Sequence, residues 1–509
     1  MTYIIAYDLG TGGIKASLFD IDGKSLSSSF FPCRTYYPEE NFREQKPEDW
    51  WKSVVNSTRD LINKTEIDIK NIKAIAVSGH SLGAVPIGYS GELLSEYVPI
   101  WSDSRATEEA NKFFKIISEK EWYEKTGNGF PPSLYAVFKI MWYKEHCREL
   151  FEKTCKFIGT KDYINYKMTG ILATDYSYAS GSGVFDLKKW EYDEELIKAS
   201  GILKDKFPDL YESTHILGTI KEKVANELGL PKTIKVACGG VDNSCMALGA
   251  GCIDEGMSYT SLGTSAWVAV TSSQPVIDID KRPYVFAHCI KGMYASATAI
   301  FSAGNSYRWI RDNVCKDIVQ VEKNGGVDSY EKMNELAKTS PIGSKKLIFN
   351  PSLAGGSSID ESQNIRGAYI GLTLGHTQAD LIRAGLEGIT LGLQNALEVL
   401  EAYVKLDNNM LIVGGGSKSP FWRQLFADIY NKNILYTKNG QQTGSLGAAA
   451  IAFVGCGLWK DFSLLKEINT DLSIIKPQEE NVTKYKKINK VFKKVAKMQS
   501  EIGEILANL

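Results

Sequence analysis

A glycine-rich turn near the start of the chain carries several groups suited to phosphate chemistry. The apolar run 4–7 ends at Asp8, and Gly10, Thr11 and Lys15 follow it. Glycines let backbone N–H groups approach phosphate oxygens, and the side chains of Thr11 and Lys15 can add hydrogen bonds. Asp8 can hold Mg²⁺ directly or through a water molecule. A tight hairpin with a capping aspartate has the same pattern, so this turn alone leaves both interpretations open.

A second carboxylate with catalytic potential stands near the middle of the chain. Asp242 and Asn243 follow two glycines and precede a run of small residues, 244–251, for which we expect a helix. An aspartate just before a helix is ordinarily an N-cap. The two glycines, however, leave room for a ligand to reach the carboxylate. Phosphoryl transfer needs a base close to the attacking hydroxyl group, so Asp242 is either a cap or that base.

Two further glycine turns resemble the first in composition. Gly263 and Thr264 follow the β-rich run 260–262 and precede another β-rich run. The glycines 414–416 leave the expected strand 411–413 and lead through Ser419 into an expected helix. A helix N-terminus of this kind favours a negatively charged ligand. A strand-to-helix loop in which Ser419 caps the helix explains the same residues, and this alternative stays open.

The elements that must position these turns follow from hydrophobic periodicity. The runs 4–7, 16–19, 72–77 and 411–413 predict strands, whereas 50–61, 134–143 and 381–400 have helical spacing. Alternating strands and helices predict an α/β protein with mixed sheets. The triplet Leu-Gly-Thr occurs at 9–11 and again at 262–264, about half the chain length apart, which favours two similar lobes.

The last stretch, 480–509, predicts a closing amphipathic helix rich in lysine. A solvated face explains these lysines, and contact with nucleic acid is the alternative.

Composition excludes several classes of protein. Lys plus Arg number 59 and Asp plus Glu number 60, so the net charge of −1 argues against a nucleic-acid partner. No apolar run reaches the roughly 18 residues of a membrane span, and the start lacks the basic region of a signal peptide. The nine cysteines form no CxxC pair and read as reduced thiols. We therefore expect a cytoplasmic protein with no membrane partner.

The motifs together resemble those of the FGGY family of carbohydrate kinases, and the resemblance covers nearly the whole chain. The matching segments are 8–15, 101–105, 139–142, 161–163, 168–170, 239–243, 262–265, 367–388 and 414–422. Ala136 and Gly385 are departures from the family patterns. The resemblance implies an α/β fold of two ribonuclease-H-like domains, the actin and hexokinase arrangement, with an interdomain cleft for ATP and sugar. Residues 1–247 would bind the sugar and carry the first phosphate hairpin, and residues 248–509 would bind the nucleotide.

The resemblance also implies roles for individual residues. Asp242 would be the general base, and Asp8 would orient ATP with its Mg²⁺. The phosphates would be lined by Gly10, Thr11, Lys15, Gly263 and Thr264. The rest of the nucleotide would contact Gly304, Gly415 and Ser419. The sugar would face His80, Ser81, Leu82, Asp242 and Asn243.

The sugar itself is less sharply defined by the sequence. Within the family the chain most resembles kinases of xylulose, which implies phosphorylation of a ketopentose such as D-xylulose to the 5-phosphate. Those kinases usually carry Gly-Gln-Met-His-Gly at the sugar loop, where this chain has Ser81 and Leu82 in place of Met-His. The alternatives are another ketose, a polyol or a sugar acid as substrate and, in a different class, a non-catalytic nucleotide switch like actin or the chaperones. His80 either contacts the sugar or stabilises its loop, and a homodimer stays open.

Overall fold

The computed structural model describes residues 2–437, 440–468 and 473–509 of the chain. It divides into two compact units, each assembled from segments that are far apart in sequence. Unit 1 comprises Met1–Asp254, Thr271–Ala295 and Gln442–Thr470, and unit 2 comprises Glu255–Val270, Ser296–Gln441 and Asp471–Leu509. The division into domains at residues 247 and 248 stays a prediction.

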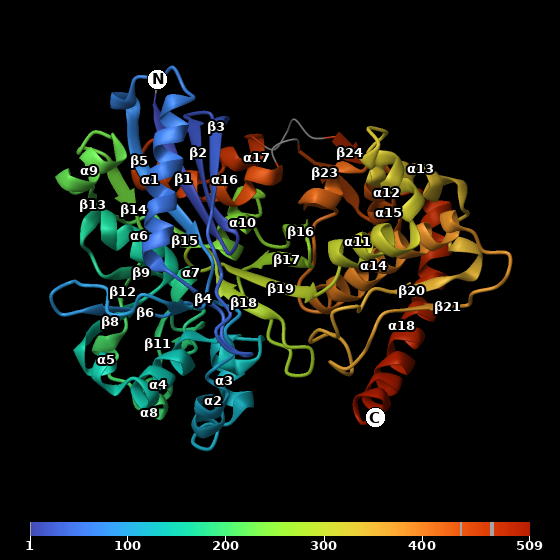
Figure 1. Cartoon of the computed structure of the whole chain (residues 1–509), viewed down its shortest axis with the longest axis horizontal. Coiled ribbons are helices and arrows are strands. Elements are labelled where there is room, and N and C mark those ends of the chain that lie inside the picture. The colour runs from blue at the N-terminus through green and yellow to red at the C-terminus, as the bar shows by residue number, and fades with distance from the viewer. Residues whose placement is uncertain (1, 438–439, 469–472) are drawn as a thin grey trace. The chain divides into compact units, whose positions relative to one another are not determined.

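Unit 1 is built on a mixed sheet in the order β13-β14-β5-β1-β2-β3, with β15 also paired to β5 (Figure 1). Its strands are β1 (Tyr3–Gly10), β2 (Gly13–Asp20), β3 (Ser25–Pro32), β5 (Ile72–Gly79), β13 (Ile216–Thr219), β14 (Lys235–Ala237) and β15 (Gly240–Val241). β1 is antiparallel to β2 and parallel to β5. The carboxyl ends of β1 and β5 therefore meet at one edge of the sheet.

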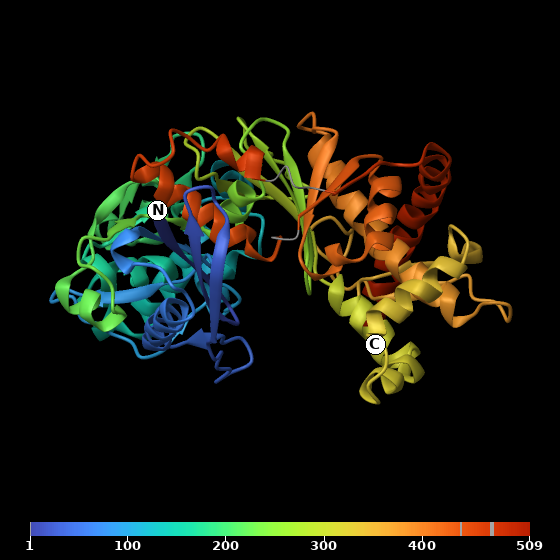
Figure 2. The same ribbon diagram turned by 90° about the horizontal axis from the view of Figure 1, so that it is seen from above.

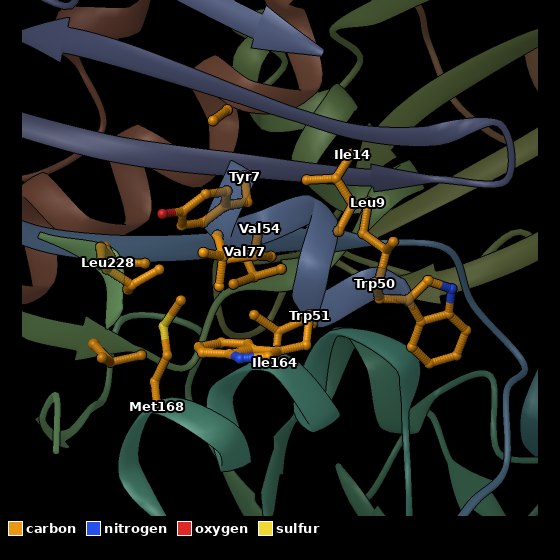
Figure 3. Packing of buried hydrophobic residues seen from close by; sticks show 14 of the residues in the cluster. Tyr7, Leu9, Ile14, Trp50, Trp51, Val54, Val77, Ile164, Met168 and Leu228 are labelled. Atoms are coloured by element: carbon orange, nitrogen blue, oxygen red, sulfur yellow. The ribbon is translucent and has the colours of Figure 1, made fainter. Parts of the chain in front are cut away.

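Both faces of this sheet are covered, which explains the continuous apolar run at its start. Tyr7 and Leu9 of β1 pack with Trp50 and Trp51 against one face (Figure 3). Ala6, which precedes Tyr7 in sequence, points to the opposite face. The hydroxyl groups of Tyr7 and Thr58 lie 2.5 Å apart, so the buried phenol is hydrogen-bonded.

The helices of unit 1 include two from late in the chain, α16 and α17. In chain order, the helices of the unit are α1 (Pro47–Asn63), α2 (Thr107–Phe113), α3 (Glu119–Thr126), α4 (Ala136–His146), α5 (Arg148–Lys153), α6 (Thr160–Thr169), α7 (Tyr176–Ala179), α8 (Glu194–Ser200), α9 (Glu222–Leu228), α10 (Asp242–Gly249), α16 (Thr443–Gly455) and α17 (Leu464–Ile468). Seen from above, red α16 lies beside the blue strands of the sheet (Figure 2), and it contacts β1, β5 and α10. The sheet is thus packed against a helix that lies about 440 positions from its first strand in the sequence.

Short strand pairs surround the unit 1 sheet. They are β4 (Glu44–Gln45) with β7 (Val98–Pro99), β6 (Val85–Gly88) with β8 (Thr154–Ile158), β9 (Ala173–Asp175) with β12 (Asp209–Tyr211), and β10 (Phe185–Asp186) with β11 (Glu191–Tyr192). β18 (Tyr284–Ala287) contacts α7 and α10.

Unit 2 contains a second mixed sheet in the order β19-β17-β16-β22-β23-β24. Its strands are β16 (Ser258–Leu262), β17 (Ala266–Ser272), β19 (Tyr294–Ile300), β22 (Asn409–Val413), β23 (Asn433–Tyr436) and β24 (Ser473–Ile475), with β20 (Ile348–Asn350) and β21 (Ala368–Ile370) as a separate pair. Its helices are α11 (Gly304–Val314), α12 (Lys316–Lys323), α13 (Ser329–Thr339), α14 (Gln378–Glu401), α15 (Pro420–Tyr430) and α18 (Glu479–Ala507).

The two sheets have the same arrangement of strands. β16 is antiparallel to β17 and parallel to β22, as β1 is to β2 and β5. β22 pairs in parallel with β23, and β23 is antiparallel to β24, which repeats the pairing of β5, β14 and β13. The two Leu-Gly-Thr triplets therefore lie at equivalent ends of equivalent strands, and the predicted similarity of two lobes is confirmed.

The other predicted elements are also present. The strands expected at 4–7, 16–19, 72–77 and 411–413 lie within β1, β2, β5 and β22, and the helices expected at 50–61 and 381–400 lie within α1 and α14. The expected helix 134–143 begins two residues later, at Ala136. Among the described residues, no helix is both long and apolar enough to cross a membrane.

Candidate active site

Asp8 lies where two strands and a helix meet in unit 1. It pairs across the sheet with Lys15 on β2 and with Ser78 on β5. Ser78 Oγ donates a hydrogen bond to Asp8 Oδ1 at 3.2 Å. Burial raises the pKa of Asp8, and Lys15 and Ser78 oppose that shift. Gly444 in the first turn of α16 is so near that a Cβ atom there would lie 3.3 Å from Asp8 Oδ2.

The turn after Asp8 opens into a hollow of unit 1. Its lining residues are Asp8, Gly10, Gly12, Gly13, Lys15 and Phe30. Gly13 adopts a φ of +152°, and a Cβ atom there would lie 2.3 Å from the carbonyl oxygen of Phe31. Glycine is therefore required for the hairpin to turn here. The hollow offers backbone amides, one cationic side chain and one carboxylate, a donor set that fits a phosphate with a hard cation.

Thr11 at the tip of this turn is fixed by residues that the sequence does not identify as part of a site. Trp101 Nε1 donates to Thr11 Oγ1 at 2.8 Å. Gln45 Nε2 donates to the carbonyl oxygen of Thr11 at 2.7 Å, and Trp50 Nε1 donates to Gln45 Oε1 at 2.8 Å. The indole of Trp101 is 36% exposed although it is a large apolar ring, and that exposure is a signal that a sequence alone cannot supply.

Asp242 is the first residue of α10 and follows directly on β15. The N-cap of α10 is Val241, so the interpretation of Asp242 as an ordinary helix cap is wrong. Its Oδ1 accepts a hydrogen bond from the N–H of Asn243 at 2.8 Å. Burial raises the pKa of Asp242 from its ordinary value of 3.8 to about 7, and the charge of Asp8 adds to this rise. The two carboxylates therefore interact, and Asp242 is poised to exchange a proton near neutral pH.

The backbone before Asp242 is fixed by a close glycine contact. Gly239 has a φ of +77°, and a Cβ atom there would lie 2.1 Å from the carbonyl oxygen of Val77. The next two residues, Gly240 and Val241, pair with Ser78 and Gly79 of β5. The loop that carries Asp242 thus runs along the strand that carries Ser78, the partner of Asp8.

A buried polar network also supports this loop. Lys161 Nζ lies 2.5 Å from Asp162 Oδ1 and 3.0 Å from Asp175 Oδ1, and all three side chains are fully buried. The hydroxyl of Ser177 donates to Asp175 Oδ2 and accepts a hydrogen bond from the N–H of Val241 at 2.9 Å. The buried charges therefore connect to the residue that precedes Asp242.

The sugar-loop residues predicted from the sequence are buried at the end of β5. His80 donates its N–H to the carbonyl oxygen of Leu9 at 3.0 Å, and its own carbonyl oxygen accepts from Thr160 Oγ1 at 2.6 Å. Among the described residues, neither ring nitrogen of His80 has a hydrogen-bond partner. Burial lowers the pKa of His80 to about 3, with Lys139 contributing, so the ring is neutral at physiological pH. Leu82 has a φ of +62°, unusual for a residue with a Cβ atom.

Lys139 is a further residue of this region whose position the sequence does not predict. Its Nζ donates to the carbonyl oxygens of Leu82 at 3.0 Å and Ile100 at 2.7 Å. Burial lowers the pKa of Lys139 to about 7. This side chain joins the sugar loop to the segment that carries Trp101.

In unit 2 the structure brings together Gly263, Thr264 and Gly304. The N–H of Gly304 donates to the carbonyl oxygen of Gly263 at 3.0 Å, and the N–H of Asn305 donates to that of Thr264 at 3.1 Å. A Cβ atom on Gly304 would lie 2.4 Å from the carbonyl oxygen of Gly263. The start of α11 is thus tied to the hairpin between β16 and β17.

The glycines 414–416 lie beside the same hairpin. Gly414 has a φ of +95°, and a Cβ atom there would lie 2.5 Å from the carbonyl oxygen of Leu262, whereas one on Gly415 would meet nothing within 4 Å. Ser419 Oγ accepts a hydrogen bond from the N–H of Trp422 at 3.2 Å and so caps α15. Gly415 therefore offers open backbone, while the hydroxyl of Ser419 is engaged in the helix cap.

The predicted site residues thus form two groups. Unit 1 holds Asp8, Gly10, Thr11, Lys15, His80, Ser81, Leu82, Asp242 and Asn243, and unit 2 holds Gly263, Thr264, Gly304, Gly415 and Ser419.

Comparison with known proteins gives matches over nearly the whole chain. A xylulose kinase of Staphylococcus epidermidis is 30% identical over 501 residues, which cover 98% of this chain and 97% of the relative. The crystal structure of a ligand-bound xylulose kinase from Lactobacillus acidophilus has a TM-score of 0.87 at 28% identity, covering 97% of this chain and 98% of that one. A gluconate kinase from the same organism has a TM-score of 0.87 at 28% identity, covering 98% of both chains.

These structures confirm the predicted fold class, an α/β protein with two ribonuclease-H-like domains of the actin and hexokinase type. Residues 3–249 match the N-terminal domain of the FGGY family of carbohydrate kinases, and residues 258–456 match its C-terminal domain. The chain therefore belongs to the FGGY family of carbohydrate kinases, enzymes that transfer a phosphoryl group from ATP to a sugar.

Proposed function

We propose that this chain phosphorylates a ketopentose such as D-xylulose with ATP, giving the 5-phosphate. The observation that carries the proposal is Asp242, whose pKa of about 7 suits a general base at neutral pH. The similarity to xylulose kinases over nearly the whole chain supports the choice of sugar.

Asp242 would accept the proton of the sugar hydroxyl group as its oxygen attacks the γ-phosphorus of ATP. The bond between the γ-phosphorus and the bridging oxygen breaks, and ADP leaves with that oxygen. Asn243 and the loop of His80, Ser81 and Leu82 would contact the sugar. The N–H of Asn243 holds Asp242 Oδ1, so the carboxylate keeps a defined orientation.

The remaining site residues would bind the nucleotide. Gly10, Thr11 and Lys15 in unit 1 and Gly263 and Thr264 in unit 2 would contact its phosphates. Gly304, Gly415 and Ser419 would contact the rest of the nucleotide, Ser419 through its backbone because its hydroxyl caps α15.

Mg²⁺ fits the surroundings of Asp8, because this half-buried residue lines a hollow together with three glycines. The ion would be held by Asp8 directly or through water. When bound, it neutralises charge on the phosphates. All nine cysteines are free thiols, which suits the cytoplasmic location predicted from the sequence.

A neutral sugar is favoured over a sugar acid by the charges near the sugar loop. His80 is uncharged at physiological pH and so offers no cation to a carboxylate. Lys139 Nζ is engaged by two carbonyl oxygens of the protein. Because one of the similar structures is a gluconate kinase, a sugar acid is the substrate with which a ketopentose should be compared.

A coupled assay of ADP release tests the substrate. D-xylulose, D-ribulose, glycerol and D-gluconate are each supplied with ATP and Mg²⁺, and we expect the largest kcat/KM with a ketopentose. The double variant Ser81→Met/Leu82→His, which introduces the Met-His pair usual in kinases of xylulose, should raise the preference for D-xylulose. A larger kcat/KM with D-gluconate or glycerol than with either ketopentose would overturn the proposed substrate.

A further inference from the structure

Helices α2 and α4 of unit 1 bring together three side chains of the types that bind metal ions. Glu109 lies on α2, and Glu145 and His146 are the last two residues of α4. The two helices contact each other (Figure 1), and one ligand atom from each of the three residues lies within 4.8 Å of the other two. Among the described residues, no other group of three His, Cys, Asp or Glu side chains is placed closely enough to share a metal ion.

Glu109 is a buried carboxylate whose hydrogen bonding is incomplete. The residue is only 1% exposed, and its Oε1 lies 3.2 Å from Nε2 of His146. Within the described part of the chain, Oε2 is shielded from water and has no hydrogen-bond partner, and His146 is the sole ion-pair partner of Glu109. Burying a carboxylate is costly unless a cation or hydrogen-bond donors compensate its charge. A metal ion held against this side chain would supply that compensation.

The imidazole of His146 is held in place and can still be reached from solvent. Its ring stacks on that of Trp142, one turn earlier on α4, with ring centres 5.0 Å apart. The guanidinium of Arg105 lies 4.8 Å from the centre of the Trp142 ring and is itself paired with buried Asp103. The side chain of His146 is 48% exposed. A histidine with an oriented ring and an accessible nitrogen is suited to binding a metal ion.

Glu145 is engaged by a lysine that would compete with a metal ion. Its Oε2 pairs with Nζ of Lys112, and both side chains are exposed. An exposed ion pair contributes little to stability, so exchanging it for a metal ion costs little. The charge of Lys112 also acts on Glu109 and would oppose a second cation there. We therefore expect Lys112 to lower the affinity of the site without closing it.

We propose that Glu109, Glu145 and His146 bind a divalent transition-metal ion, and that Zn²⁺ is the ion that fits best. Zn²⁺ binds imidazole nitrogen and carboxylate oxygen at about 2.0–2.2 Å in a tetrahedral arrangement, which sets neighbouring ligand atoms roughly 3.3–3.6 Å apart. The 3.2 Å between His146 Nε2 and Glu109 Oε1 is close to that separation. Water would take the fourth position, on the solvent side. The bound ion would join the end of α4 to α2.

The types of ligand separate this site from the one proposed for Mg²⁺ at Asp8. Imidazole nitrogen suits Zn²⁺ and related ions, whereas Mg²⁺ prefers oxygen ligands and keeps several waters. The lining of the hollow at Asp8, as far as the structure describes it, contains neither histidine nor cysteine. Excess Mg²⁺ should therefore occupy the site at Asp8 and leave the α2–α4 site free for Zn²⁺, so the two can be tested separately.

Isothermal titration calorimetry of the full, tag-free chain with Zn²⁺ in excess Mg²⁺ tests the proposal. We expect one Zn²⁺ per chain. His146→Gln should weaken its binding at least about a hundredfold, because even residues that only hydrogen-bond to metal ligands contribute about 10- to 100-fold to affinity. His215→Gln is the matched control, since His215 is exposed and stacks on Tyr211 but lies outside the group. A wild-type chain that binds no Zn²⁺, or a His146→Gln chain that binds Zn²⁺ as the wild type does, would overturn the proposal.

Two more variants test the carboxylates. Glu109→Gln should weaken Zn²⁺ binding to a similar extent, whereas Lys112→Met should strengthen it roughly two- to tenfold, because Glu145 loses its competing partner. Unfolding curves without Zn²⁺ show whether each variant is folded, and added Zn²⁺ should raise the unfolding midpoint of the wild type and not that of His146→Gln. Lys112 is exposed, so its variant tests Glu145 even if the Glu109 variant does not fold. A Lys112→Met chain that binds Zn²⁺ no more tightly than the wild type would overturn the assignment of Glu145 as a ligand.

Discussion

Two carboxylates of unit 1, Asp8 and Asp242, lie close enough for the charge of the first to raise the pKa of the second. Both are also raised by burial, and only Asp8 has a cation, Lys15, among the groups that oppose the shift. A pair of like charges in different surroundings separates two roles: Asp8 is suited to holding a cation, and Asp242 to taking up a proton.

Removing the charge of Asp242 should stabilise the folded protein at alkaline pH. Its pKa rises from 3.8 to about 7 on folding, so ionisation is penalised only in the folded state. The penalty is absent below about pH 4, grows as pH rises to about 7 and is complete above it. We expect Asp242→Asn to increase the free energy of unfolding by about 1–4 kcal/mol at pH 8, and by little at pH 4. Urea unfolding at both pH values measures this, with Asp209→Asn as an exposed control, and an equal effect at both would contradict it.

The same pKa predicts the pH dependence of catalysis. Protonated Asp242 cannot accept the proton of a hydroxyl group, so kcat/KM for the sugar should fall about tenfold per pH unit below about 7. Asp8→Asn removes a neighbouring negative charge and should move this acidic limb of the residual activity to lower pH. The pH profile of both proteins measures it. A limb at the same pH in both would show that the charge of Asp8 does not act on the base.

For single residues, the sequence points to the two carboxylates more clearly than to the residues that support their loops through hydrogen bonds. Asp8 and Asp242 stand beside glycines, and that local pattern makes both candidate site residues, although a capping aspartate has the same pattern. Gln45, Trp101 and Ser177 act through partners up to 90 residues away, such as the contact of Trp101 with Thr11. No local pattern contains a contact of that kind, so these contacts become visible only in the fold, although Trp101 lies in the segment 101–105 that resembles the family.

Two helices of unit 1, α10 and α16, contact each other at glycines, and their first turns lie at the two carboxylates Asp242 and Asp8. α10 begins at Asp242, and the first turn of α16 places Gly444 against Asp8. A Cβ atom on Gly447 would lie 1.9 Å from the carbonyl oxygen of Cys245, and one on Gly249 would lie 1.8 Å from that of Thr443. The spacing of the two helices is therefore set by backbone contact.

Gly447→Ala should force α10 and α16 apart. We expect a loss of about 1–3 kcal/mol in the free energy of unfolding, because the backbone atoms it meets cannot move aside as a side chain could. kcat should fall as well, because Asp242 and Asp8 move relative to each other. Gly375→Ala is the control, since a Cβ atom on Gly375 would have Thr373 Oγ1, 3.8 Å away, as its nearest neighbour. Unfolding curves and steady-state kinetics of both variants test this prediction. A Gly447→Ala enzyme with wild-type stability would contradict the claim that backbone contact sets the spacing of α10 and α16.

The network around Asp175 predicts a difference between two serines. Ser177 and Ser213 both donate to Asp175 Oδ2, but only Ser177 also accepts from the N–H of Val241. Each change to alanine should cost about 1–3 kcal/mol of stability. Only Ser177→Ala should also lower kcat with little change in the KM for ATP, because it releases the residue before Asp242. Equal kcat values for the two variants would show that the network does not position the base.

Predictions of single elements succeed here where their signal is local. Strands β1 and β2 and helix α1 follow from apolar period and turn residues within about 20 positions. The return of α16 to the sheet of unit 1 depends on contacts between residues more than 400 positions apart, which periodicity does not encode. The sequence therefore predicts β1, β2 and α1, but it does not predict that α16 packs against the sheet of unit 1.

For the whole molecule, one repeated sheet explains where the two sets of site residues come from. The order of strands in unit 1 is repeated in unit 2, and each places a glycine hairpin at the same corner, between β1 and β2 and between β16 and β17. The Leu-Gly-Thr triplets signal this repeat in the sequence. Among the described residues, the interacting pair Asp8 and Asp242 lies beside the hairpin of unit 1, so catalysis is expected from unit 1 and nucleotide binding chiefly from unit 2.

The most direct test of the central claim is sugar-dependent ADP release by the wild type and by Asp242→Ala at pH 8 with Mg²⁺. The wild type should release ADP with a ketopentose far faster than without sugar. Asp242→Ala should lose at least about a hundredfold in kcat, as expected for a general base, while its affinity for ATP changes little. A wild type that no sugar or polyol stimulates, or an Asp242→Ala variant that retains turnover, would contradict the account.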